Sequence, residues 1–218
     1  MRVVGGVWRG RRLAAPAGCA TRPTSDLVRE AIFDVLSAMA ADLGAADHWA
    51  VGSGSESAAV GSGSEFGAVG SGSEPLAGLA VLDLFAGSGA LGIEGLSRGA
   101  SSCAFVERMP AAVRVLRENL ARVGAPAQVV HVRATDYRRA LKADAACGRL
   151  YNLVLVDAPY ALYPAVEPEL AGRLPAVLSP GAVVVVETAK DRAVSLPLVE
   201  RSVKMYGDTR VTFLQARS

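Results

Sequence analysis

Cysteine and histidine are scarce in this sequence, which limits the chemistry that it can support. The 218 residues include three widely spaced cysteines (Cys19, Cys103 and Cys147) and two histidines (His48 and His131). Without a C-x-x-C pair, neither a disulfide framework nor a zinc knuckle is indicated, and we expect a reduced, cytoplasmic protein. Nothing groups the histidines with acids, so no metal site is expected.

Long apolar runs are also missing, although 51% of the residues are apolar. No stretch approaches the roughly 18 apolar residues of a membrane span, and the segment MRVVGGVWRGRR lacks the apolar stretch of a secretory signal. The chain is long enough for one domain with a sizeable core. We therefore expect no membrane partner.

Positive charge is concentrated near the N-terminus, while the net charge of the whole chain is only +2. Residues 1–22 contain no acid and five arginines, which are Arg2, Arg9, Arg11, Arg12 and Arg22. A basic arm on a slightly acidic body suits a polyanionic partner such as RNA. A solvated, charged hairpin is the alternative interpretation.

Three copies of AVGSGSE, beginning at Ala50, Ala59 and Ala68, interrupt the chain. Sequence rich in Gly and Ser keeps the backbone flexible and offers little apolar surface to offset the entropy of ordering. We therefore expect a low-complexity insertion over residues 44–78. It would separate an N-terminal piece (1–43), predicted as two short strands and a helix, from the main body (79–218).

The main body alternates apolar strands with helices, which indicates a parallel sheet covered on both faces. The strand candidates are 80–85, 103–107, 128–132, 153–157 and 182–187, with helices near 90–98, 110–123, 136–146 and 164–178. The tail, LVERSVKMYGD and TRVTFLQ, predicts an antiparallel pair at the edge of the sheet. Ligands bind beyond the carboxyl ends of such parallel strands. We call this edge the rim, and four acids are expected there: Asp83, Glu107, Asp136 and Asp157.

The segment DLFAGSGALG places Gly87, Gly89 and Gly92 in a G-x-G-x-x-G turn between a strand and a helix, a pattern typical of dinucleotide sites. Asp83 favours another ligand, because a carboxylate just before the turn repels a pyrophosphate and attracts a cationic amino group. S-adenosylmethionine offers such an amino group together with a ribose and an adenine. Glu107 is then placed to accept hydrogen bonds from the ribose hydroxyls.

Asp136 follows the third strand and has two interpretations. It is placed to accept a hydrogen bond from the adenine amino group of the cofactor. Alternatively, it only caps the next helix. The sequence leaves both open.

The fourth strand ends in the segment DAPY, residues 157–160. Methyl transfer to an exocyclic amine needs the nitrogen lone pair turned toward the methyl group. Two hydrogen-bond acceptors, one for each N–H of the amine, achieve this orientation. Asp157 supplies one acceptor and the carbonyl of Ala158 the other, held by Pro159. Tyr160 offers a flat face on which an extruded base can stack. An ordinary turn after a strand is the alternative interpretation.

The identity of the acceptor amine depends on the carboxylate. Guanine presents N1–H beside its 2-amino group, and a carboxylate can accept from both donors. Adenine presents its amino group beside an acceptor, which suits an amide better. Asp157 therefore favours guanine N2, and adenine N6 stays open.

On these residues the chain resembles the bacterial small-subunit (16S) ribosomal RNA guanine-N2 methyltransferases, which are class I S-adenosylmethionine-dependent enzymes. Their signatures are similar to GGVWRGRRL, TRPTSDLVREAIFDVL, VLDLFAGSGALGIEGLSRGA, FVERMPAAVRVLRENL and YGDTRVTFL. The resemblance implies a Rossmann-like fold with a mostly parallel seven-stranded sheet, an antiparallel edge hairpin and a small N-terminal hairpin and helix. It implies ribosomal RNA or the assembling small subunit as the partner.

The resemblance also implies roles for individual residues. The implied cofactor contacts are Asp83, Phe85, Gly87, Gly89, Glu107, Asp136 and Thr24, the implied RNA contacts are the five N-terminal arginines, and the catalytic loop comprises Asp157, Ala158, Pro159 and Tyr160. The family pattern is D-P-P-Y, so Ala158 keeps the carbonyl acceptor and loses one rigid element. The repeat insertion is a second departure from the family pattern.

Three alternatives to the guanine-N2 activity follow from the same residues. Adenine-N6 and other amino-group methyltransferases share the D-x-P-Y site. A nicotinamide-dependent oxidoreductase would use the glycine turn. A non-catalytic RNA-binding assembly factor would use only the basic arm.

Overall fold

A computed structural model describes residues 1–15, 25–42 and 74–217 of the chain. Arg22, Thr24 and most of the repeat insertion lie outside the described residues, and so do the predictions that concern them. Among the helices that the structure describes, none is long and apolar enough to cross a membrane.

The described elements follow the predicted alternation of strands and helices. In chain order they are η1 (Gly6–Trp8), α1 (Asp26–Asp42), β1 (Ala80–Leu84), α2 (Ala90–Ser97), β2 (Ser102–Glu107), α3 (Pro110–Arg122), η2 (Ala127–Val129), β3 (Val130–Ala134), α4 (Tyr137–Ala146), β4 (Tyr151–Val156), α5 (Tyr163–Arg173), η3 (Leu174–Val177), β5 (Leu178–Ala189), β6 (Val199–Tyr206) and β7 (Thr209–Gln215).

Seven strands form one sheet in the order β3-β2-β1-β4-β5-β7-β6. Strands β1 to β5 pair in parallel, and β7 pairs antiparallel with both β5 and β6. The predicted fold class, a mostly parallel sheet with an antiparallel edge hairpin, is confirmed. The strand order changes direction between β1 and β4, which is the point where open sheets of this kind form a ligand crevice.

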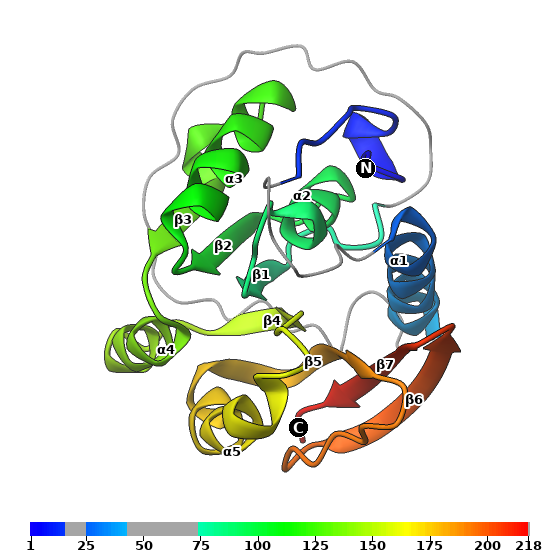
Figure 1. The fold of residues 1–218 in the computed structure, drawn as a ribbon, viewed down its shortest axis with the longest axis vertical. Helices are drawn as coiled ribbons and strands as arrows, with labels where there is room; N and C mark the ends of the chain where they lie inside the picture. The colour runs from blue at the N-terminus through cyan, green and yellow to red at the C-terminus, as the bar shows by residue number, and fades with distance from the viewer. Residues whose placement is uncertain (16–24, 43–73, 218) are drawn as a thin grey trace.

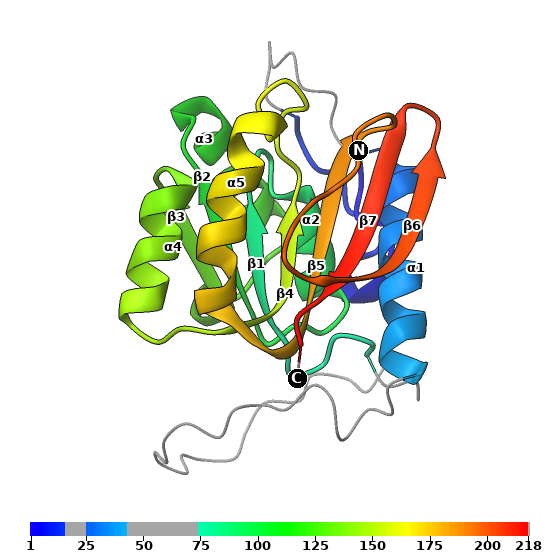
Figure 2. The ribbon, with the colours of Figure 1, turned by 90° about the horizontal axis from the view of Figure 1, so that it is seen from below.

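Alternate residues of each strand face two separate apolar layers, as a strand period of two requires. In β4, Leu153 and Leu155 join the layer that contains α1, α2 and α3 side chains. Val154 and Val156 join the layer that contains α4 and α5 side chains. Figure 1 shows these two sets of helices on opposite sides of the sheet, and Figure 2 shows the sheet from below. Both faces of the parallel strands are therefore buried.

Four predicted boundaries need correction, and two of them shift at prolines. The fifth strand was expected over 182–187 and runs over Leu178–Ala189. The third strand was expected over 128–132 and runs over Val130–Ala134, because a short 3-10 turn, η2, follows Pro126. The helix expected over 164–178 ends at Arg173, and the 3-10 segment η3, which carries a proline in its first turn, follows it. The two N-terminal strands reduce to one bridge, Arg2 to Arg12, around η1.

Residues 1–15 are attached to the main body by buried polar side chains that the sequence did not single out. The Glu94 carboxylate accepts a hydrogen bond from the Val4 amide at 2.8 Å, and Ser97 Oγ accepts one from the Trp8 amide at 2.9 Å. Asn119 Oδ1 accepts from the Ala14 amide at 2.8 Å. All three side chains are fully buried. The N-terminal segment therefore supplies hydrogen-bond partners to buried polar groups of α2 and α3.

Arg29 on α1 makes a second attachment. Its side chain is fully buried, donates to the Arg2 carbonyl and forms an ion pair with Asp26 at 2.7 Å. Glu94 lies 3.7 Å from the same guanidinium. Removing one member of a buried ionic group such as this is strongly destabilising, because the remaining charge stays buried.

Candidate active site

Asp83 is the fourth residue of β1 and lies under the glycine turn. It is 1% exposed, and its Oδ2 accepts a hydrogen bond from the Gly92 amide at 2.9 Å. The pKa of Asp83 is raised to about 7, mainly by burial; the hydrogen bond from the Gly92 amide lowers it in part, and the nearby Glu107 carboxylate contributes to the rise. A cationic group beside this carboxylate would favour its ionised form.

Two glycines of the turn are required by close packing. A Cβ at Gly89, where φ is +81°, would lie 2.2 Å from Leu116 Cδ1. A Cβ at Gly92 would lie 2.4 Å from the Phe105 ring and 2.9 Å from Asp83 Oδ2. The turn therefore brings the start of α2 against β1 and β2 at a distance that no other residue allows.

Glu107 ends β2 and joins that strand to the glycine turn. Its Oε2 accepts a hydrogen bond from the Gly87 amide at 2.9 Å, and its Oε1 accepts one from the Met109 amide at 2.7 Å. A carboxylate oxygen accepts more than one hydrogen bond, so both oxygens keep capacity for hydroxyl donors of a ligand. The two amides fix the direction of the side chain.

Asp136 is the N-cap of α4, as the alternative interpretation of the sequence predicts. Its Oδ1 accepts a hydrogen bond from the Arg138 amide at 2.9 Å, and its Oδ2 lies 3.6 Å from Nη1 of Arg138. Next to it, the Phe85 and Tyr137 rings pack with centroids 5.0 Å apart. Contact between Asp136 and a cofactor adenine stays a prediction.

Asp157 follows β4 directly, at the strand-order switch. In the register of the sheet, Val156 of β4 lies opposite Leu84 of β1, so the chain segments that carry Asp83 and Asp157 reach the same edge. Pro159 begins the turn into α5, since its carbonyl accepts from the Leu162 amide at 2.8 Å and the Tyr163 amide at 3.2 Å.

Ala158 is 1% exposed and packs in the layer beneath α4 and α5. Its side chain is therefore held by apolar contacts. The turn keeps its position through Pro159 and this buried methyl group.

Tyr160 contacts two residues that sequence reasoning missed, Glu187 and Thr209. Its hydroxyl lies 3.1 Å from Glu187 Oε1 and 2.9 Å from Thr209 Oγ1. The pKa of Tyr160 is raised to about 12, mainly by burial; the Thr209 hydrogen bond lowers it in part, and the Glu187 carboxylate contributes to the rise. A signal for Glu187 was present, because it ends the apolar run AVVVVE as Glu107 ends the run CAFVE. No local pattern marks Thr209.

Four of the predicted RNA-binding arginines lie in the described part of the N-terminal segment, and all four are exposed: Arg2, Arg9, Arg11 and Arg12. Arg2 lies 3.8 Å from the Asp26 carboxylate, and Arg11 donates to the Val123 carbonyl at 2.5 Å. Arg2 and Arg11 thus also help to attach the segment. Arg9 and Arg12 are the better candidates for contacts with another molecule.

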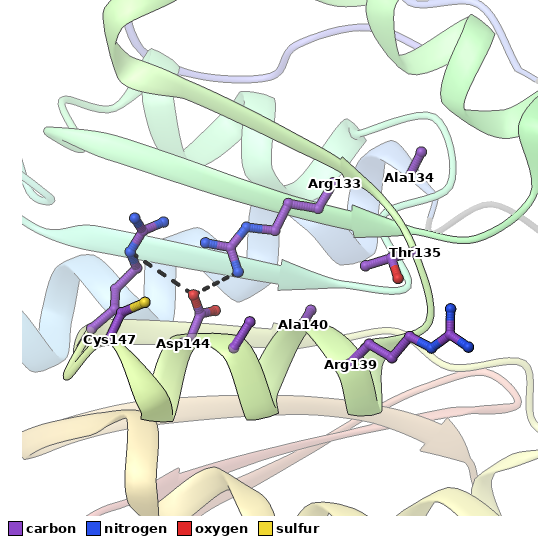
Figure 3. A pocket seen from close by; sticks show the side chains of 9 residues that line it. Arg133, Ala134, Thr135, Arg139, Ala140, Asp144 and Cys147 are labelled. Carbon is purple, nitrogen blue, oxygen red and sulfur yellow. Dashed lines mark ion pairs between the residues drawn. The ribbon is translucent and has the colours of Figure 1, made fainter.

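A groove of about 390 Å³ lies between β3 and α4, and none of the four rim acids is among the residues that line it (Figure 3). Arg133 reaches from β3 to the buried Asp144 of α4, with 2.6 Å between Nη1 and Oδ1. Asp144 also accepts from the Tyr151 hydroxyl at 2.9 Å. Asp144 is therefore a partnered structural carboxylate. Within the described ranges, no three side chains of His, Cys, Asp or Glu gather as metal ligands.

Comparison with known proteins gives the family. Residues 1–62 and 63–215 match the family described as Conserved hypothetical protein 95. The chain belongs to this family. It is 34% identical to Bacillus subtilis YlbH, described as a candidate rRNA methyltransferase, over 73% of this chain and 67% of that protein. It is 32% identical to Ribosomal RNA small subunit methyltransferase D of Escherichia coli K12, over 73% of this chain and 60% of that protein.

A solved structure shows the same family fold over the full chain. The Escherichia coli protein yhhF, described as a candidate methyltransferase, matches with a TM-score of 0.72 and 25% identity, covering 100% of this chain and 98% of that one. The sequence matches to YlbH and to methyltransferase D, by contrast, span about two thirds or less of those proteins.

Proposed function

We propose that this chain transfers a methyl group from S-adenosylmethionine to the exocyclic N2 of a guanine in small-subunit ribosomal RNA. One observation carries the proposal: the neighbouring strands β1 and β4 bring two acids, Asp83 and Asp157, to the same edge of the sheet at the point where the strand order changes direction. Asp83 lies opposite Leu155, so Asp157 follows two residues further along the neighbouring strand. That offset corresponds to about 7 Å along the strand. The names of the curated relatives support methylation of ribosomal RNA and do not specify the base.

The residues of β1 and β2 fit S-adenosylmethionine, which when bound supplies a methyl group on a positively charged sulfur. Asp83 offers a buried carboxylate to a cationic amino group, and its raised pKa indicates that this position lacks positive charge in the protein alone. Glu107 offers two fixed oxygens to a pair of ribose hydroxyls. A dinucleotide fits less well, because its pyrophosphate would approach the Asp83 carboxylate.

The loop after β4 fits an extruded base. The Asp157 carboxylate accepts a hydrogen bond from one N–H of the exocyclic amine, and the Ala158 carbonyl accepts a hydrogen bond from the other. These two hydrogen bonds turn the nitrogen lone pair toward the methyl donor. Tyr160, 40% exposed, presents its ring for stacking. The chain's own contribution is then alignment and electrostatic stabilisation of the positive charge that reaches the amine.

A carboxylate at position 157 supports guanine over adenine. Guanine presents two adjacent donors, N1–H and the 2-amino group, and ionised Asp157 has acceptors only. Adenine N1 is an acceptor and would face the carboxylate without a proton between them. The exposed Arg9 and Arg12 support an RNA substrate, since phosphate contacts from arginine provide affinity without sequence preference.

The test is transfer of labelled methyl groups from S-adenosylmethionine to small ribosomal subunits, and to their naked RNA, isolated from a strain that lacks this activity. We expect label in N2-methylguanosine, identified by the mass of the nucleoside after digestion. Label in N6-methyladenosine would contradict the choice of base. Absence of label from both substrates, with the cofactor bound, would contradict the function.

A further inference from the structure

Two residues on the antiparallel side of the sheet touch the proposed catalytic loop. Tyr160 lies after β4, Glu187 lies in β5, 27 residues further along the chain, and Thr209 begins β7, 49 residues further. The sheet order β4-β5-β7 brings their elements together. Thr209 pairs with Ala189 near the end of β5 and with Tyr206 of β6, so the tip of the edge hairpin reaches the rim.

The hydrogen-bond directions follow from the chemistry of the three groups. Tyr160 has one hydroxyl hydrogen, and its pKa of about 12 keeps that hydrogen in place at physiological pH. A carboxylate accepts only, so the Tyr160 hydroxyl donates to Glu187 Oε1. Thr209 then donates to the Tyr160 oxygen. The phenol is thereby held at both its hydrogen and its oxygen.

We propose that Glu187 and Thr209 are positioning residues that hold the Tyr160 ring against the acceptor base. The inference rests on the proposed function, and it adds two residues that do not touch the reacting atoms. A tyrosine ring with a mobile hydroxyl would occupy several rotamers at an exposed rim. Fixing the hydroxyl leaves the ring in one orientation. The base can then stack on a ring that is already oriented beside Asp157.

Glu187 is 6% exposed and lies opposite Val211 of β7 in the sheet, and a buried carboxylate is costly unless it serves a partner. It makes further contacts besides the phenol. A purely structural role in the sheet is therefore the competing explanation, and the experiment must separate the two.

A double-mutant cycle between Tyr160→Phe and Glu187→Ala separates these explanations. Tyr160→Phe keeps the ring and removes both hydrogen bonds, and we expect kcat/KM for RNA to fall about tenfold with unchanged affinity for S-adenosylmethionine. Glu187→Ala should cause a similar loss, and Glu187→Gln, which retains an acceptor oxygen, should recover part of it. The double variant should be no worse than Tyr160→Phe alone. Additive losses would overturn the proposal, because Glu187 would then act without Tyr160.

Thr209→Val tests the second contact, since it removes the hydroxyl and keeps the shape. We expect a loss of about threefold that vanishes in the Tyr160→Phe background. Thr188→Val is the matched control. Thr188 directly follows Glu187 in β5, and its hydroxyl donates to the Arg192 carbonyl and not to Tyr160. Equal losses in Thr188→Val and Thr209→Val would indicate general weakening of the sheet and would contradict the proposal.

A readout independent of activity keeps this inference distinct from the proposed function. Fluorotyrosine can be incorporated, and the ¹⁹F signal of position 160 is assigned by its loss in Tyr160→Phe. We expect that signal to shift and broaden in Glu187→Ala and Thr209→Val and to stay unchanged in Thr188→Val. An unmoved signal overturns the positioning role even if RNA is methylated. A moved signal in a protein that methylates no RNA supports the contact and contradicts only the proposed function.

Discussion

The two halves of the rim are built in different ways. On the half that we propose binds the cofactor (the cofactor half), Asp83 and Glu107 are fixed by backbone amides that lie 2 to 20 residues away in sequence. On the half that we propose binds the acceptor base (the acceptor half), Tyr160 is held by side chains 27 and 49 residues away, from strands on the far side of β4. The first half is a local turn, and the second depends on completion of the whole sheet. Affinity for the cofactor and placement of the base should therefore respond to different substitutions.

Asp157→Ala should cause the largest loss of methyl transfer, and it changes only the acceptor half. Loss of a positioned electrostatic group in an active site costs about 10²–10³-fold in rate, and we expect a fall in methyl transfer of at least that size. Affinity for S-adenosylmethionine, measured by calorimetry, should change less than twofold. Asp191→Ala, which removes an exposed acid just after β5, is the control and should keep full activity. An equal loss of cofactor affinity would contradict the division of the rim.

Asp83→Asn changes only the cofactor half, and its effect, a loss of cofactor affinity, should be the next largest. A hydrogen bond to a charged group contributes about 1.5–3 kcal/mol, so cofactor affinity should fall about 10- to 100-fold. With saturating cofactor the rate should recover most of its original value, since the acceptor half is intact. A rate that stays low at saturation would contradict the assignment of Asp83 to the cofactor.

Asp83 also gives the cofactor half a dependence on pH. Its pKa is raised from 3.8 to about 7, so the folded protein without ligand holds this proton between these values while the unfolded chain has released it. The free energy of unfolding should therefore fall as pH rises from about 4 to 7, relative to Asp83→Asn. Cofactor affinity should rise over the same interval, with release of a proton on binding below pH 7. Calorimetry in buffers of different ionisation enthalpy measures that proton.

Removal of Arg9 and Arg12 together should give the smallest effect and leave both halves intact. RNA binding should weaken, and the slope of log affinity against log salt should decrease by about one for each phosphate that the variant no longer binds. The matched control is Arg139→Ala with Lys142→Ala, which removes two exposed cations from α4 on the opposite face of the sheet. Equal effects in the two pairs would indicate a general effect of net charge and not a role of the N-terminal segment in binding RNA.

The strands and the glycine turn of the cofactor half could be predicted from the sequence because their determinants are local. Strand period, glycine spacing and the acid at the end of each strand all lie within about 25 residues, and the structure has these elements within two or three residues of the expected bounds. The hydrogen bond between Tyr160 and Thr209 could not be predicted, because it depends on which strand lies beside β5. The buried group of Arg29 and Glu94 was missed for a similar reason, since charged residues on helices are usually solvated and their pairing depends on tertiary packing.

Asn119 connects the first residues of the chain to the glycine turn. Its Nδ2 donates to the Ala14 carbonyl and to the Ser88 carbonyl, both at 3.0 Å. A shortened version of this protein that begins at β1 would remove one of the two acceptors of Asn119 Nδ2, the Ala14 carbonyl, and leave only the Ser88 carbonyl. The same shortened chain would take the Val4 amide and Arg29 from the Glu94 carboxylate and leave it, among the described residues, Arg98 alone. Residues 1–15 therefore contribute to the packing that supports the glycine turn, and shortening the chain at β1 would weaken that support.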